Sequence, residues 1–167
     1  MDDGYFDDVM ELREQHGADI VMLIANDMNG YCGVAYVGGP IGAVARACAT
    51  LNGQYSFAHE IGHQFGAMHD RTVSGTHDTN RGYIDNAKCF RTLMSYNYCI
   101  CSPCPRILYY SNTRDEYEGK KTGTALENNI VRMEQFAPTL AASVEAHTDT
   151  NSGGPAFQLC TNDPCEE

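Results

Sequence analysis

The spacing of apolar residues divides the first third of the chain into a helix and three short strands. Apolar residues recur at helical spacing over residues 5–16, and Gly17 follows where a helix would end. The short run over residues 18–25, apolar except for Asp19, is typical of a strand buried on both faces. Residues 33–37 predict a second strand. Residues 42–49 predict a third, although their alanines favour a strand less strongly.

The rest of the chain combines two helical patterns with a long irregular segment. A helix is predicted over residues 54–66, with Ser56 as a candidate N-cap. Residues 68–111 are rich in Gly, Asn, Asp, Cys and Tyr and show little periodicity, so we expect mostly loops held by disulfides. Helical spacing returns over residues 125–146, where we expect Pro138 to interrupt the helix.

Length and composition indicate a single folded domain with a short extension. The chain has 167 residues, of which 43% are apolar and 20% charged, values typical of a globular protein. The sequence NSGGP at residues 151–155 predicts a linker. We therefore expect one domain over residues 1–150 and a cysteine-containing extension over residues 151–167. No stretch is long and apolar enough to predict a membrane span.

The formal net charge of −11 argues against nucleic acid as a partner, because phosphates require a basic face. We interpret this acidity as an aid to solubility. The N-terminal sequence MDDGYFDD lacks the basic and apolar regions of a signal peptide. If the protein is exported, we expect its signal to lie upstream of these residues.

Eight cysteines in a chain of this length predict disulfides and an oxidising, extracellular compartment. Proximity in the sequence favours pairing Cys32 with Cys48 and Cys160 with Cys165. The other four form a crowded group, namely Cys89, Cys99, Cys101 and Cys104. A metal cluster at the last three of these is the alternative hypothesis.

The segment HEIGHQFGAMHD, residues 59–70, has the pattern of a metal site. Residues four apart lie on one face of a helix, so His59 and His63 can bind one metal while Glu60 stands beside them. Gly66 can turn the chain out of the helix, and His69 can return as a third nitrogen ligand. Three imidazoles leave one coordination position open, which is typical of a catalytic zinc. We therefore predict one zinc ion per chain.

The chemistry of such a site requires an unligated base. Zinc lowers the pKa of a bound water to about 7, and Glu60 can accept its proton as it attacks a peptide carbonyl. The two histidines of HEIGH could by themselves be an accidental pair on a solvated helix face. Gly66 and His69, however, follow His63 at the spacing that a third metal ligand needs. Gly62 within the helix indicates close packing, because glycine costs about 1 kcal/mol there relative to alanine. The remaining histidines, which have no comparable partners, are interpreted as surface residues: His16, His77 and His147.

The segment resembles the metzincin clan of zinc endopeptidases, whose pattern HExxHxxGxxH it matches. Residues 92–96, TLMSY, look like the methionine turn of the clan, which implies that Met94 lies beneath the metal. Tyr96 matches a position that approaches the metal or the transition state in some members. The residue after the third histidine separates families within the clan. Asp70 at this position resembles the adamalysin or reprolysin type.

Over residues 10–147 the chain is similar to bacterial reprolysin-like proteases, including those of the peptidyl-Asp type. The resemblance implies an α+β, zincin-like fold. It has a twisted mixed sheet above a cleft, the zinc helix as its floor, and a smaller irregular lobe that ends in a helix. The strand over residues 33–37 would be an edge strand that pairs with substrate, or alternatively a core strand. The family's first strand, long helix and second strand would precede residue 5, so we expect an exposed sheet edge or an uncovered neighbouring face here.

The resemblance implies a secreted, monomeric zinc endopeptidase that cuts proteins or peptides. The alternative is a catalytically inactive binding or adhesion module of the same fold, although such members commonly lose the glutamate or a ligand. A zinc hydrolase with a non-peptide substrate fits the motif but has no specific support. No loop has a recognisable calcium-binding pattern.

The resemblance also raises the question of substrate preference. Peptidyl-Asp proteases prefer an acidic residue just after the cleaved bond, and the clan builds the wall of that pocket from the segment after the methionine turn. This segment contains Arg106, which we expect to form a bidentate pair with the substrate carboxylate. The alternative is a solvated arginine and a pocket for an apolar side chain.

Overall fold

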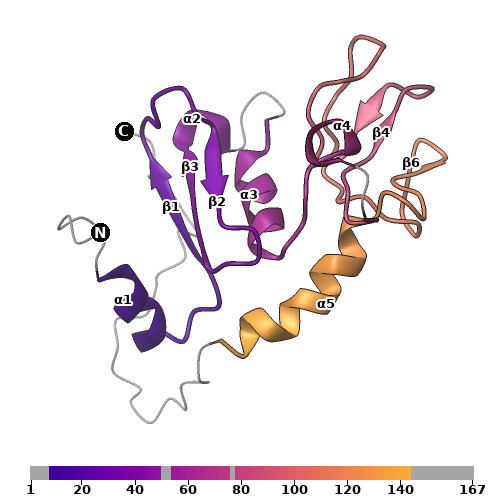
Figure 1. The fold of residues 1–167 in the computed structure, drawn as a ribbon. Helices are drawn as coiled ribbons and strands as arrows, with labels where there is room; N and C mark the ends of the chain where they lie inside the picture. The colour runs from indigo at the N-terminus through magenta and orange to yellow at the C-terminus, as the bar shows by residue number, and fades with distance from the viewer. Residues whose placement is uncertain (1–7, 50–53, 76–77, 144–167) are drawn as a thin grey trace, which may run out of the picture.

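The computed structural model describes residues 8–49, 54–75 and 78–143. Its main sheet contains β1 (Val21–Ala25), β2 (Gly33–Ala35) and β3 (Ile41–Ala45) in the order β1-β3-β2 (Figure 1). Strand β1 runs parallel to β3 and β2 runs antiparallel to it. Strand β2 therefore lies at an edge of the sheet, as one of the two interpretations of this segment predicted.

Helix α3 (Ser56–Gln64) packs on one face of the sheet, against β2 and β3. Val44 of β3 is fully buried, and its partner in the register is Gly33 of β2. At the end of the helix, the side-chain amide of Gln64 donates hydrogen bonds to the backbone oxygens of Val21 (3.0 Å) and Pro40 (2.9 Å). These contacts tie the end of the helix to β1 and to the residue before β3.

The other elements are short and surround this layer. A helix precedes the sheet, and an irregular lobe with two strand pairs and a final helix follows α3 (Figure 1). These elements are α1 (Val9–Gln15), α2 (Arg46–Ala49), α4 (Arg71–Ser74), β4 (Ile84–Asp85), β5 (Phe90–Arg91), β6 (Glu116–Tyr117), β7 (Lys120–Lys121) and α5 (Asn129–Ala141). The prediction of a fold that mixes helices with small sheets is confirmed, as is the irregular lobe.

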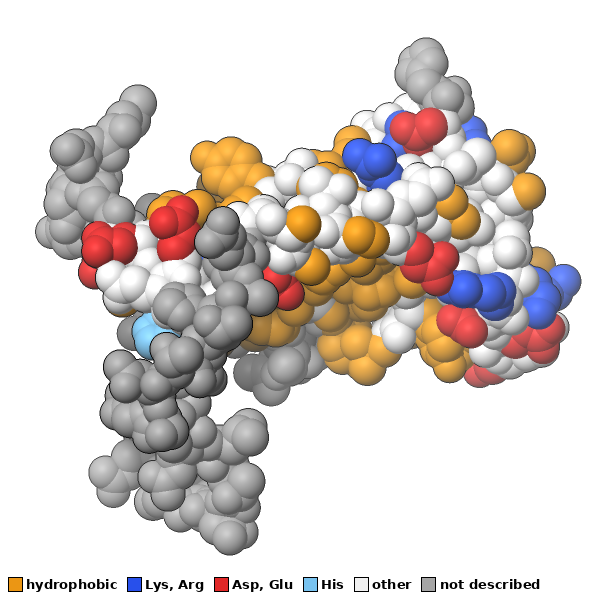
Figure 2. All heavy atoms as spheres, turned by 90° about the horizontal axis from the view of Figure 1, so that it is seen from below, with side chains coloured by type: hydrophobic (Ala, Val, Ile, Leu, Met, Phe, Trp, Pro, Cys, Tyr) orange, Lys and Arg blue, Asp and Glu red, His pale blue; other side chains and the backbone are white. Residues whose placement is uncertain are grey.

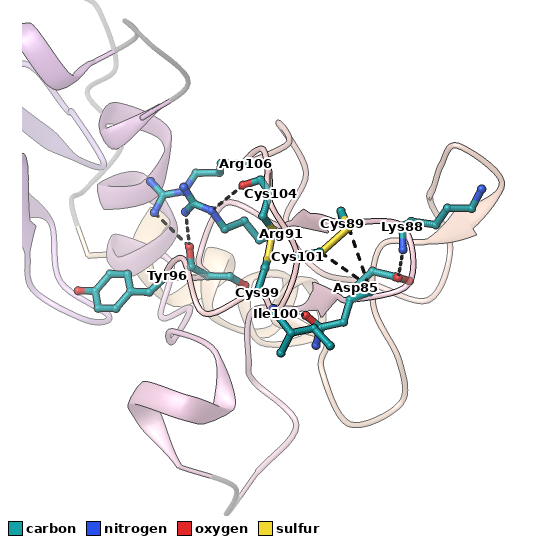
Figure 3. The surroundings of a disulfide bond; sticks show 12 residues. Asp85, Lys88, Cys89, Arg91, Tyr96, Cys99, Ile100, Cys101, Cys104 and Arg106 are labelled. Carbon is teal, nitrogen blue, oxygen red and sulfur yellow. Dashed lines mark hydrogen bonds between the residues drawn. A yellow bond between two sulfur atoms is a disulfide. The ribbon is translucent and has the colours of Figure 1, made fainter.

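Three disulfides connect the described cysteines. The predicted pair Cys32–Cys48 is confirmed. The crowded group forms Cys89–Cys101 and Cys99–Cys104 (Figure 3), so the alternative of a metal cluster is wrong because its three sulfurs are all bonded to other sulfurs. Cys160, Cys165, the linker at 151–155 and the whole extension lie outside the described residues.

Two predictions about the sheet were wrong. The run over residues 18–25 is not buried on both faces, since Leu23 is 37% and Ile24 57% exposed. Strand β1 has a strand neighbour only on its β3 side within the described residues, so the sheet does not enclose it. Residues 42–49 do not form one strand, because β3 ends at residue 45 and α2 follows directly. The alanines there favour a helix over a strand.

The ends of the two long helices also differ from prediction. Ser56 is the first residue of α3 and not its N-cap, which is Tyr55 in a left-handed conformation without a side-chain cap. Helix α5 begins later than expected, because the side chain of Asn128 accepts a hydrogen bond from Val131 N and caps it there. Pro138 lies within α5 without ending it, since its carbonyl still accepts a hydrogen bond from Ala142 N (3.0 Å).

The sheet face opposite α3 is apolar. Leu23 and Val34 both pair with Ala43, and neighbouring Gly33 faces the helix, so these side chains point to the other face. Val34 is 59% exposed. Figure 2, seen from below, also shows hydrophobic side chains gathered over the middle of the molecule, with charged ones nearer its ends.

None of the described helices is both long and apolar enough to cross a membrane.

The disulfide connectivity gives a testable prediction. Peptide mapping of the unreduced protein should recover the linked pairs Cys32–Cys48, Cys89–Cys101 and Cys99–Cys104. Because each disulfide contributes roughly 2–4 kcal/mol, reduction should also lower the melting temperature substantially. Free thiols at these six positions in the native protein would contradict the structure.

Candidate metal centre

Helix α3 and the turn after it bring three imidazoles together. His59 and His63 lie one helical turn apart and are both buried. Gly66 has a φ of +84°, a left-handed conformation that suits glycine, and its N–H donates to His63 O (2.7 Å). The chain then returns so that His69 Nε2 lies 3.1 Å from His59 Nε2 and 2.9 Å from His63 Nε2. The three nitrogens converge on one point that can hold a metal ion.

Backbone carbonyls fix the orientation of two of the rings. His59 Nδ1 lies 2.7 Å from Leu93 O, and His63 Nδ1 lies 2.8 Å from Ala67 O. A carbonyl oxygen can only accept a hydrogen bond, so each Nδ1 carries the proton and each Nε2 keeps a free lone pair. This arrangement is the one that histidine ligands of a metal need.

Burial also keeps the rings neutral. It lowers the pKa of His59 to about 3 and that of His69 to about 4, with the positive charge of Arg106 acting in the same direction. Burial lowers the pKa of His63 as well. Neutral imidazole is the form that binds a metal, so the donor set fits a catalytic zinc ion.

Glu60 lies between the metal centre and the edge strand. Its side chain passes so close to Gly33 of β2 that a Cβ at that position would overlap the carboxylate. Burial raises the pKa of Glu60 to about 7, while Arg106 acts to lower it. A carboxyl group with such a pKa can take up and release a proton near neutral pH.

The loop over residues 92–96 packs against α3. Met94 is fully buried, and a Cβ on Gly62 would lie 2.5 Å from its sulfur. The close packing predicted from Gly62 is therefore confirmed. The ring of Tyr96 lies 4.5 Å from that of His69, measured between centroids. The methionine loop and the ring of Tyr96 thus both adjoin the histidine cluster.

Asp70 joins the third histidine to the same loop. Its carboxylate is buried and accepts hydrogen bonds from Tyr96 N (2.9 Å) and from Thr72 N (2.9 Å), the second of which caps helix α4. Because Asp70 follows His69 directly, these bonds restrain the position of the His69 backbone.

Arg106 contacts both the segment before α3 and the loop over residues 92–96. It donates hydrogen bonds to Gln54 O (2.5 Å), two residues before α3, and to Ser95 O (3.1 Å). The arginine is half-buried. His16 is exposed as predicted, whereas His77 and His147 lie outside the described residues.

Sequence reasoning missed two neighbours of the site. Gly33 gave no signal beyond its place in a predicted strand, and Arg91 none beyond its proximity to the methionine loop. Gly33 approaches the centre only because β2 packs against α3, whereas Arg91 lies directly before the methionine loop and donates to Ser95 O.

Comparison with known families agrees with this geometry. The model of "Metallo-peptidase family M12", of reprolysin type, matches residues 5–111. The chain belongs to metallopeptidase family M12. Curated relatives of this M12 chain include the peptidyl-Asp metalloendopeptidases of Xanthomonas campestris pv. campestris (37% identical over 131 residues) and Stenotrophomonas maltophilia strain K279a (40% over 134).

The M12 chain spans about a third of the length of these relatives. Each alignment covers 74% of the chain but only 30% of the Xanthomonas protein and 31% of the Stenotrophomonas protein. A solved structure described as "Structure of a chaperone-substrate complex" shares the fold, with a TM-score of 0.62 at 21% identity. The match covers 81% of this chain and 22% of that one.

Removal of one imidazole should strongly weaken metal binding. His63→Ala should weaken zinc affinity by roughly 100-fold or more, since even outer partners of metal ligands contribute about 10–100-fold. Zinc content per chain, measured by plasma mass spectrometry after dialysis, checks this. His16→Ala is the matched control and should keep the parent's zinc content. Full occupancy in His63→Ala would refute the assignment.

Proposed function

We propose that this chain is the catalytic part of a secreted zinc metalloendopeptidase of the metzincin, adamalysin/reprolysin-like type. The observation that carries the proposal is the convergence of the three histidine Nε2 atoms beside the buried carboxyl of Glu60. Membership of family M12 and the name of the curated relatives support it.

The proposed mechanism begins with Glu60. A zinc ion held by His59, His63 and His69 would supply a water of lowered pKa and a positive charge for the developing oxyanion. Glu60 accepts the proton of the attacking water and later returns it to the leaving amine. Its pKa of about 7 suits both steps. We propose that Tyr96, which is 40% exposed and whose ring lies beside that of His69, donates a hydrogen bond to the oxyanion.

Strand β2 offers a way to hold an extended substrate. Its outer edge has no strand partner among the described residues, so a peptide can add to the sheet through main-chain hydrogen bonds. Because Gly33 of this strand has no side chain, the substrate backbone and the carboxylate of Glu60 can approach each other closely. The alternative of an inactive module has less support, since the glutamate and all three histidines are present.

The proposal extends to location and substrate. Six described cysteines in disulfides favour an oxidising compartment, so we propose that the protein is secreted. We also propose that it acts as a monomer. The relatives are named peptidyl-Asp metalloendopeptidases, and we propose that this protein also cuts proteins or peptides next to an aspartate.

The role of Glu60 can be separated from metal binding. Glu60→Gln should keep the parent's zinc content, because the residue is not a ligand, but should lose about 100- to 10,000-fold in kcat. Cleavage of a denatured protein, followed by mass spectrometry of the new termini, measures the activity. Glu134→Gln, which alters an exposed glutamate paired with Arg114, is the control. Loss of zinc together with activity would show that the role is misassigned.

The contact between β2 and Glu60 gives a second test. In Gly33→Ala the new methyl group overlaps the carboxylate, so kcat should fall by more than about tenfold while zinc content and melting temperature change little. Val34→Ala alters the opposite face of the same strand and should lower kcat much less. Equal effects of the two substitutions would argue against a role for this contact.

A further inference from the structure

The segment that carries the third histidine has no regular secondary structure. Residues 65–70 follow α3 without forming a helix or a strand, so their carbonyl groups need hydrogen-bond partners from elsewhere in the chain. Two of these partners are side-chain amides. Asn129 Nδ2 donates to Met68 O (3.0 Å), and Asn80 Nδ2 donates to Gly66 O (2.8 Å). Two asparagines thus hold the backbone directly before the third histidine.

The two amides also bind each other, which fixes the orientation of both. Asn129 Nδ2 donates to Asn80 Oδ1 (3.0 Å) as well as to Met68 O. An amide nitrogen carries two N–H groups, so both donors of Asn129 are used. Because Asn80 Oδ1 accepts from Asn129, the amide nitrogen of Asn80 faces Gly66 O. A carboxylate at position 129 could donate neither bond, since it has no N–H group.

Asn129 is itself held firmly in place. It is the first residue of helix α5, which begins beside the lobe that follows α3 (Figure 1), and it is fully buried. Ser111 Oγ accepts a hydrogen bond from Asn129 N (2.9 Å), and its hydroxyl can donate to Arg81 O (2.5 Å) or to Asn129 Oδ1 (2.9 Å). A buried polar network whose members are all bonded is rigid, so it can define the position of the turn.

The third histidine depends on its backbone more than the other two do. Carbonyl oxygens hold the Nδ1 atoms of His59 and His63, whereas His69 Nδ1 has no hydrogen-bond partner in the described part of the chain. Its ring is placed by packing against Tyr96 and by the backbone itself, where Gly82 N donates to His69 O (3.3 Å). A shift of the turn would therefore move His69 Nε2 away from the other two nitrogens.

We propose that Asn129 is a positioning residue of the metal centre. Its amide holds Met68 O directly and Gly66 O through Asn80, and so sets where His69 Nε2 lies relative to the two imidazoles of α3. Asn129 lies 61 residues beyond Met68 in the sequence, so helix α5 takes part in building a site whose ligands all precede it. The inference rests on the metal centre of the proposed function and is independent of the substrate.

Asn129→Asp in the full chain tests the inference, because it keeps the size of the side chain but replaces both donors with an acceptor. Zinc affinity, measured by competition with a chromogenic chelator, should fall by about tenfold or more, as for other groups that orient metal ligands. The visible absorption bands of the cobalt-loaded protein should change in position and intensity, because they respond to ligand geometry. Parent values of both in folded Asn129→Asp would overturn the inference.

Asn112→Ala is the matched control. Asn112 is another buried asparagine of the same lobe, but its side chain bonds only within residues 110–115. The substitution should lower the melting temperature of the metal-free protein and leave zinc affinity and the cobalt spectrum as in the parent. Equal losses of zinc affinity in Asn112→Ala and Asn129→Asp would also refute the positioning role, because both would then reflect only the stability of the lobe.

A second variant covers the case in which Asn129→Asp does not fold. Asn80 is only half-buried, and Asn80→Asp removes the donor to Gly66 O but keeps the acceptor for Asn129. Zinc affinity should fall by about threefold or more, as expected for the loss of one hydrogen bond. An affinity equal to the parent's would contradict the proposal. If the parent itself binds neither zinc nor cobalt, the metal centre and the proposed function fail instead.

Discussion

The contact between helix α3 and the loop over residues 92–96 supports the whole metal centre. His59 Nδ1 donates to Leu93 O, and the next residue of the loop, Met94, packs against the helix at Gly62. A side chain on Gly62 would push the loop away, and the carbonyl would then no longer hold the ring. The orientation of His59 Nε2 therefore depends on a residue that has no polar group of its own.

The same loop organises the surroundings of the centre. Tyr96 N donates to Asp70 and so restrains the segment of His69, while Ser95 O accepts from both Arg91 and Arg106. A few consecutive residues thus connect His59 of α3, His69 and the two arginines. Because each connection is a hydrogen bond to the backbone, it requires the loop conformation more than its side chains.

Electrostatics divide the site into two parts. The histidines and Glu60 are buried, which favours their neutral forms and leaves them able to bind a metal or exchange a proton. Arg106 lies close by and stays positive, since its pKa falls only to about 10 through burial and the repulsion of Arg91. In a chain of net charge −11, this places a short-range cation beside a nearly neutral reaction centre.

Local geometry explains what the sequence by itself determined. Histidines four residues apart share a helix face, and the turn at Gly66 returns the chain after a fixed number of residues, so the three imidazoles were predicted to meet and do. The pairing Cys32–Cys48 and the helices α1, α3 and α5 also followed from nearby residues. Glu60 as the base and zinc as the metal stay predictions, because they concern chemistry beyond the fold.

Only the tertiary structure decided the features that depend on distant segments. The pairing within the group of four cysteines, the exposure of β1, and the approach of Gly33 to Glu60 each arise where separate segments pack together. The same holds for Arg91 and Arg106, which are fifteen residues apart in the sequence but joined by a β-bridge. Spacing along a chain specifies contacts within one helix or turn, whereas contacts between segments depend on which surfaces are buried together.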